Sequence, residues 1–144
     1  MIEILSSRRE YTKINPFVVL LGKGDHQITS SWTDPRGYVR QKMLGITCSN
    51  FTFVGKGKET TTILGGFCID NLENITFKNM TVTNTSDGGV GIYMSNAKVE
   101  LFDVALKGCY DAGLGVWHSF SESTISKFTT CCYNSSYRIR ISYI

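Results

Sequence analysis

The chain has 144 residues, a length typical of one domain, and 42% of them are apolar, which is enough to fill a core. Charged side chains make up only 19%, and 15 basic against 12 acidic groups leave a net charge of +3. This balance argues against a disordered chain and against the clustered basic surface of a nucleic-acid-binding protein, so we expect no nucleic-acid partner. No stretch approaches the roughly 20 consecutive apolar residues of a membrane helix, and we expect no membrane contact.

The N-terminal segment Met1–Glu10 carries an acidic residue at Glu3 and has no apolar stretch that ends in small residues. It therefore predicts no signal peptide. The five cysteines are odd in number and show no metal-binding spacing; they are Cys48, Cys68, Cys109, Cys131 and Cys132. We expect free, mostly buried thiols in a reducing compartment, with no metal site and no cofactor.

From Phe17 onward the chain contains short segments in which alternate residues are apolar, separated by Gly, Asn, Asp or Ser. Alternation with a period of two predicts β-strands, and the period of 3.6 that indicates a helix does not appear after Phe17. In chain order these segments are 17–21, 45–48, 51–54, 60–64, 66–69, 75–82, 91–94, 99–106, 115–118 and 125–134. The sequence therefore predicts an all-β protein.

The segments repeat along the chain with a period of 21 to 25 residues, which is 24 in the best-matched pairs. The pattern of 75–82 recurs in 99–106, and 51–53 precedes 75–77 by the same interval. The alignment continues at that interval through further pairs: Asp87 with Asp111, Gly89 with Gly113, and Gly91–Met94 with Gly115–His118. Short strands with a long period favour a chain that coils, so that each rung stacks on the previous one in parallel sheets.

Such stacking places equivalent side chains in columns that face the core. We expect one column of Ile46, Phe67, Ile92 and Val116, and a second of Phe51, Ile75 and Val99. An antiparallel β-sandwich, either up-and-down or Greek-key, is the main structural alternative.

In residues 50–64 a strand, a Gly-x-Gly turn and a Thr-Ile strand follow one another, and residues 17–28 form a strand–Gly–strand element. Both stretches resemble the opening rungs of the right-handed parallel β-helix proteins of the pectin-lyase-like superfamily. The resemblance implies a right-handed parallel β-helix, a solenoid of about six rungs. It implies a single domain over residues 1–144, with an N-terminal cap over 1–16 and rungs over 17–144.

Polygalacturonase-like members of that superfamily carry Asn-Thr-Asp, Asp-Asp, Gly-His-Gly and Arg-Ile-Lys motifs in this order. Imperfect counterparts occur here in the same order, at 84–87, 110–111, 115–119 and 138–140. The resemblance makes Asp87, Asp111 and His118 candidate catalytic residues, because acid–base hydrolysis needs two carboxylates about 5–9.5 Å apart. The competing interpretation is that these matches arise by chance or from the repeat, and alternation places His118 on the core-facing side with Val116.

One set of outward positions suggests a ligand surface. Tyr93 and Trp117 stand one repeat apart and out of phase with the core columns, and Arg138 and Arg140 continue the same outer face. Stacked aromatic rings bounded by arginines suit sugar rings and acidic groups, so these four residues are candidate ligand-binding residues. The alternatives are that the aromatic side chains pack against a neighbouring loop or lie in an oligomer contact.

Two classes of function follow. The first is a non-catalytic module that acts as a structural, attachment or carbohydrate-recognition element of a viral or surface assembly, with an acidic polysaccharide or glycan as partner. The second is a polysaccharide-degrading enzyme, similar to pectin lyases or polygalacturonases, or a degenerate descendant of one. The small number of rungs leaves little room for long substrate-binding loops and favours the first class. We expect a cytoplasmic or virion-associated location.

The C-terminal segment 137–144 reads as an apolar strand with no polar cap after it. An open edge of a parallel sheet promotes association. We therefore predict that a protein partner or a second copy of the chain covers this end.

Overall fold

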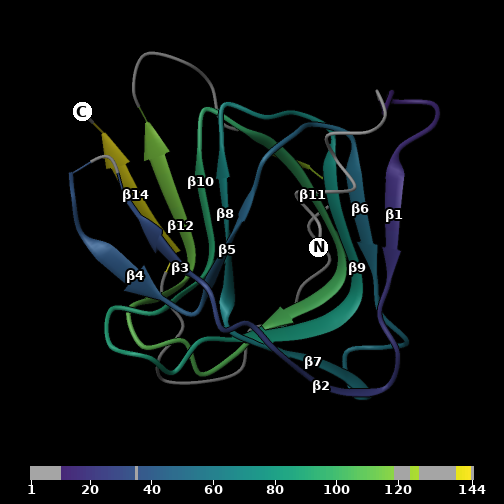
Figure 1. Ribbon diagram of the computed structural model, residues 1–144, viewed down its shortest axis with the longest axis horizontal. Coiled ribbons are helices and arrows are strands. Elements are labelled where there is room, and N and C mark those ends of the chain that lie inside the picture. Colours follow the sequence, from purple (N-terminus) through teal and green to yellow (C-terminus); the bar gives the residue numbers. More distant parts are fainter. Residues whose placement is uncertain (1–10, 35, 119–123, 127–138, 144) are drawn as a thin grey trace.

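A computed structural model of the chain describes residues 11–34, 36–118, 124–126 and 139–143 (Figure 1). These residues form β-strands and no helix, which confirms the all-β class, and no described segment is a helix able to span a membrane. The strands are β1 (Phe17–Leu20), β2 (Gly24–Gln27), β3 (Ser31–Thr33), β4 (Val39–Gln41), β5 (Met43–Ile46), β6 (Phe51–Val54), β7 (Thr61–Leu64), β8 (Gly66–Asp70), β9 (Ile75–Thr83), β10 (Val90–Ser95), β11 (Lys98–Leu106), β12 (Ala112–His118), β13 (Thr124–Ser126) and β14 (Ile139–Tyr143). Most of the predicted cap, residues 1–10, lies outside the described residues.

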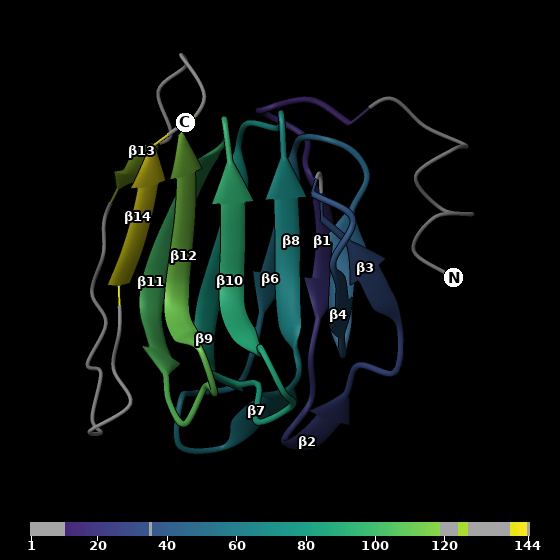
Figure 2. The same ribbon diagram turned by 90° about the vertical axis from the view of Figure 1, so that its left-hand side faces the viewer.

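Most of the strands belong to two parallel sheets on opposite sides of the core (Figure 1). The curved sheet contains β1, β6, β9, β11 and β13 in that order, with β2 and β7 continuing it beside β9. The five-stranded sheet contains β14, β12, β10, β8 and β5. The first four of these strands face the viewer in Figure 2. From β9 onward the chain crosses between the sheets at every step, so each strand pairs with the strand two places earlier. This parallel pairing is not that of an antiparallel sandwich.

The register expected from the repeat is confirmed in the curved sheet. Ile75 pairs with Val99 and Val82 with Leu106, so β9 and β11 keep one spacing along their whole length. Phe51 pairs with Ile75, which continues the same column into β6. Identical alternation in the three strands produces this register, because a slip of one residue would turn the apolar side chains outward.

In the five-stranded sheet the expected pairing of Phe67 with Ile92 is confirmed. The expected register is wrong by two residues between β10 and β12 and between β5 and β8, where Phe67 pairs with Leu44 rather than Ile46. Ile92 pairs with Leu114 rather than Val116, and Val116 pairs with Met94. Between β10 and β12 the cause is a shorter turn, since seven residues separate Val82 from Val90 but only five separate Leu106 from Ala112. A slip of two preserves the pleat, so the core-facing set stays apolar although its columns differ. The observed columns are Leu44, Phe67, Ile92 and Leu114, and Ile46, Ile69, Met94 and Val116.

Aromatic rings fill the centre of the core. Phe53 and Phe77, neighbours in β6 and β9, stack with ring centroids 5.2 Å apart and an interplanar angle of 7°. Phe67 of the opposite sheet contacts both rings, at 5.3 and 4.8 Å. These three buried side chains join the two sheets, and replacing one with Ala would cost about 3–5 kcal/mol.

Stacked asparagines support one corner of the fold. Asn50 and Asn74 precede β6 and β9 with φ of 68° and 56°, a left-handed conformation that Asn tolerates better than most residues. The Asn74 amide nitrogen donates to the Asn50 side-chain oxygen at 2.9 Å, and Asn96 donates to Asn71 at 2.8 Å. Each of these pairs thus supplies both a turn conformation and a bond between two neighbouring turns of the chain.

The β3–β4 hairpin is an element that the strand pattern did not predict. Its strands are antiparallel, with Trp32 opposite Arg40, and residues 34–38 connect them. The hairpin lies on the outer face of the five-stranded sheet, where Trp32 approaches Gly45 of β5. It is inserted between β2 and β5 and covers part of the face that we expected to bind a ligand.

Candidate functional site

The outer face of the five-stranded sheet holds the residues proposed for ligand binding. One column across this face runs Gly45, Cys68, Tyr93, Gly115 and Arg140. Tyr93 therefore lies beside Gly115 and not beside Trp117, which pairs with Ser95. The expected Tyr93–Trp117 stack is wrong for the same reason as the register, namely the shorter turn before β12.

Tyr93 faces outward as expected but is covered. Only 5% of it is exposed, because the Trp32 ring of the hairpin lies 5.1 Å from it at 48°. The two side chains form a small second core with Met43, Cys68, Val90 and Ala112. For Tyr93, the alternative of packing against the chain's own loop is confirmed. Its position beneath the hairpin does not provide an open platform for a sugar ring.

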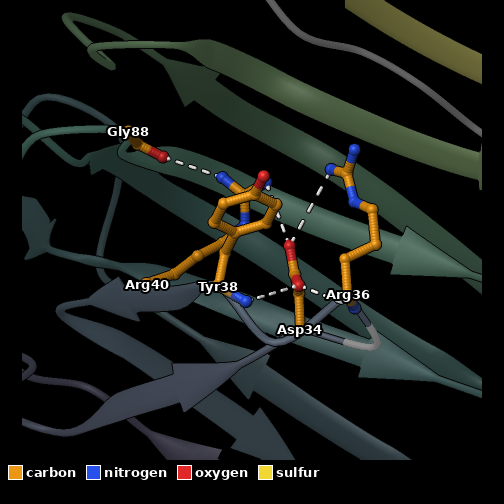
Figure 3. A network of polar contacts seen from close by, with 5 residues as sticks. All are labelled: Asp34, Arg36, Tyr38, Arg40 and Gly88. Atoms are coloured by element: carbon orange, nitrogen blue, oxygen red, sulfur yellow. Dashed lines mark hydrogen bonds and ion pairs between the residues drawn. The ribbon is translucent and has the colours of Figure 1, made fainter.

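An ion-pair network stabilises the hairpin turn (Figure 3). Asp34 is 3% exposed, and its Oδ1 accepts backbone N–H bonds from Arg36 at 2.9 Å and Tyr38 at 3.0 Å. Its Oδ2 faces the Arg40 Nη2 atom at 3.5 Å and the Arg36 Nη2 atom at 3.8 Å. The Asp34 side chain thus closes the turn and offsets part of the positive charge of these two arginines.

Arg40 connects this turn to the sheet. Its Nη1 donates to the Gly88 carbonyl at 3.0 Å, just before β10 (Figure 3). Its guanidinium carbon lies 5.6 Å from the centre of the Tyr93 ring. The Asp34 Oδ2 and Arg40 Nε atoms are buried without a hydrogen bond. The pair therefore acts through charge and packing more than through a bidentate bond, and the arrangement is that of a structural clamp.

Burial also decides the protonation of two groups beneath the hairpin. Burial, the largest cause, raises the pKa of the Cys68 thiol above its ordinary value. Burial first, and the charge of a Cys68 thiolate second, raise the pKa of Tyr93 to about 12. Both groups stay neutral at ordinary pH, so Cys68 is a packing residue and not an activated nucleophile. Cys48, Cys68 and Cys109 are free thiols.

The candidate catalytic residues do not occupy equivalent turn positions. The Asp111 N–H donates to the Gly89 carbonyl at 2.8 Å, which aligns Asp111 with Gly89 and not with exposed Asp87. His118 is the last residue of β12 and pairs with Tyr143. The equivalence of Asp87 and Asp111 that the repeat predicted is therefore wrong, and their role as catalytic residues stays a prediction.

Several predicted residues fall where side chains are not described. Arg138 lies outside the described residues. Trp117, His118 and Arg140 are placed only by strand register. Within the described chain, no three His, Cys, Asp or Glu side chains gather closely enough to hold a metal ion.

A hollow that no sequence motif indicated lies at a corner of the fold. It has a volume of about 510 Å³ and is lined by segments at or after the ends of β2, β4, β7 and β9. Its lining residues are spread from Gln27 to Ser86, and only the folded chain brings them together. In the sequence, the one local indication of this hollow was the cluster of Thr and Ser at 83–86.

Comparisons with family models, with curated proteins and with solved structures return no match for this chain.

Proposed function

We propose that the chain is a right-handed parallel β-helix module with a non-catalytic role, a structural, attachment or carbohydrate-recognition element of a viral or surface assembly. The parallel stacking of β6, β9 and β11 in the register of the repeat carries this proposal. Such stacking builds a rigid rod from local repeats, which suits a scaffold. The stacked asparagines and phenylalanines reinforce it at the corner and in the centre.

Two observations favour a non-catalytic role over the alternative of a polysaccharide-degrading enzyme. Asp111 aligns with Gly89, which removes the repeat-based reason for an aspartate pair with Asp87. The hairpin closes the outer face over Tyr93, which leaves β12 and β14 as the part of that face farthest from it.

The proposed glycan contact therefore shifts towards β12 and β14. Gly115 has no side chain between Tyr93 and the position of Arg140 in the next strand, and Trp117 follows on the same outer face by alternation. An aromatic residue and an arginine on one face suit an acidic sugar. We also propose Arg138 as a residue that binds the acidic group of the glycan.

The proposed partner site is the C-terminal edge. Among the described strands, β14 is the last of the five-stranded sheet and pairs with β12 on one side. An unpaired strand edge favours association, so we propose a partner protein or a second copy at this end.

A glycan array combined with a reducing-sugar assay on acidic polysaccharides tests the function. We expect binding without release of reducing ends. Trp117→Ala should weaken binding, whereas Tyr110→Ala, which removes an exposed aromatic ring in the turn before β12, should not. Release of reducing ends would establish the enzymatic alternative. Unchanged glycan binding in Trp117→Ala would show that the glycan contacts another surface.

A further inference from the structure

The polar hollow at the corner of the fold is built by segments that are distant in sequence. Leu64 at the end of β7 lies beside Gln27 of β2 on one side and Thr83 of β9 on the other. The Gly66 N–H donates to the Lys42 carbonyl at 2.8 Å, which adds the connection between β4 and β5. Four connections therefore meet in one corner.

The shape of this hollow is set by close backbone contacts. Gly65 has a φ of +143°, and a Cβ at this position would lie 2.7 Å from the Ile28 Cβ and 2.8 Å from the Lys42 oxygen. Only glycine permits this approach. Buried Asn84 supports the other side, because its amide nitrogen donates to the Val90 carbonyl at 3.2 Å and to the Lys42 carbonyl at 3.4 Å. The hollow is therefore formed before any ligand arrives.

The lining has a simple chemical character. Apart from Gly65 and the apolar Ile28 and Leu64, it consists of hydroxyl and amide side chains, with Lys42 as the one charged lining residue and no acidic one. The polar side chains are those of Gln27, Thr29, Gln41, Thr83, Thr85 and Ser86. No carboxylate in the described part of the chain pairs with Lys42. Lys42 also has a φ of 54°, an uncommon conformation for a residue other than Gly, Asn or Asp.

We propose that this hollow binds a small polyhydroxylated anion, a monosaccharide that carries one carboxylate or one phosphate. The Lys42 ammonium balances the negative group, and the hydroxyl and amide side chains hydrogen-bond the sugar hydroxyls. A volume of about 510 Å³ lies within the usual range of small-molecule sites. The hollow is separate from the outer face of β12 and β14, so this proposal does not rest on the proposed function.

The test is a titration of the ¹⁵N-labelled chain with glucuronate, with glucose 6-phosphate and with glucose. We expect saturable shifts of the Thr29, Thr83, Thr85 and Ser86 amides with at least one anion, and much weaker binding of glucose. The anion that binds more tightly identifies the negative group as carboxylate or phosphate.

Variants assign the site to the residues named. Lys42→Gln should weaken anion binding about tenfold, the effect of losing one charge-assisted hydrogen bond. Lys56→Gln is the matched control, since it removes an exposed charge outside the hollow, and it should bind as the original chain does. Thr85→Val keeps the side-chain shape and should weaken binding without changing the melting temperature.

Three results would overturn the proposal. They are the absence of saturable shifts at these amides with both anions, equal affinity for glucose and the anions, and equal affinity in Lys42→Gln and Lys56→Gln. Because the probes are monosaccharides and the readout is local to the hollow, the result is independent of polysaccharide binding at β12 and β14.

Discussion

Trp32 of the β3–β4 hairpin lies over Tyr93 of β10, with ring centroids 5.1 Å apart and an interplanar angle of 48°. This contact joins an inserted antiparallel element to the parallel sheet beneath it. Aromatic pairs of this geometry add about 0.5–1.5 kcal/mol to the effect of burial alone. The contact of Trp32 with Tyr93 therefore determines whether the hairpin covers the outer face of the five-stranded sheet at Tyr93.

Trp32→Ala should uncover Tyr93 and lower the free energy of unfolding by about 2–4 kcal/mol, somewhat below the cost for a fully buried ring because Trp32 is half-buried. Urea denaturation measures the change. Tyr38→Ala removes an exposed aromatic ring from the same hairpin and should cost less than about 0.5 kcal/mol. Equal effects of the two substitutions would contradict the covering role of Trp32.

Asp34→Ala should destabilise the chain by about 3 kcal/mol, because it leaves Arg40 without its buried counter-ion and two backbone N–H groups without an acceptor. Arg36→Ala removes the outer partner, whose side chain is 48% exposed, and should cost less than about 1 kcal/mol. Chemical denaturation of both variants measures this difference. A larger loss in Arg36→Ala would show that the ion pair with Arg40 is not the main contact.

At the corner asparagines we expect Ala to be a more destabilising substitution than Gly, which is the reverse of the usual order. At Asn74, with a φ of 56°, Ala both loses the bond to Asn50 and enters an unfavourable backbone region, whereas Gly loses only the bond. We expect Asn74→Ala to lower the free energy of unfolding by about 2–3 kcal/mol and Asn74→Gly by about 1 kcal/mol. In a regular strand Gly would be the worse substitution, so thermal denaturation that shows Gly to be worse here would refute the left-handed turn.

Stability should also fall at high pH. Since burial raises the pKa of Tyr93 to about 12 from 10, the unfolded chain loses this proton before the folded chain does. The contribution is complete below about pH 10 and is lost as pH rises through about 12. Tyr93→Phe should therefore flatten the decline of stability with pH in this window, measured by urea denaturation. Tyr110→Phe, at an exposed tyrosine, should leave the profile unchanged.

The sequence alone was sufficient for the register of β6, β9 and β11 in the curved sheet. Because side chains alternate with a period of two, the apolar positions of 75–82 and 99–106 allow one register that buries them, and Ile75 does pair with Val99. The same local information predicted the all-β class and the outward direction of Tyr93.

The tertiary structure decided the surroundings of these strands. Turn length has no periodicity, so the shorter connection between Leu106 and Ala112 shifted β12 and separated Tyr93 from Trp117. The cover over Tyr93 comes from Trp32, which lies far earlier in the chain, through a packing contact that leaves no local pattern. The polar hollow has the same origin, because Lys42 and Thr85 share a site only when both sheets have formed.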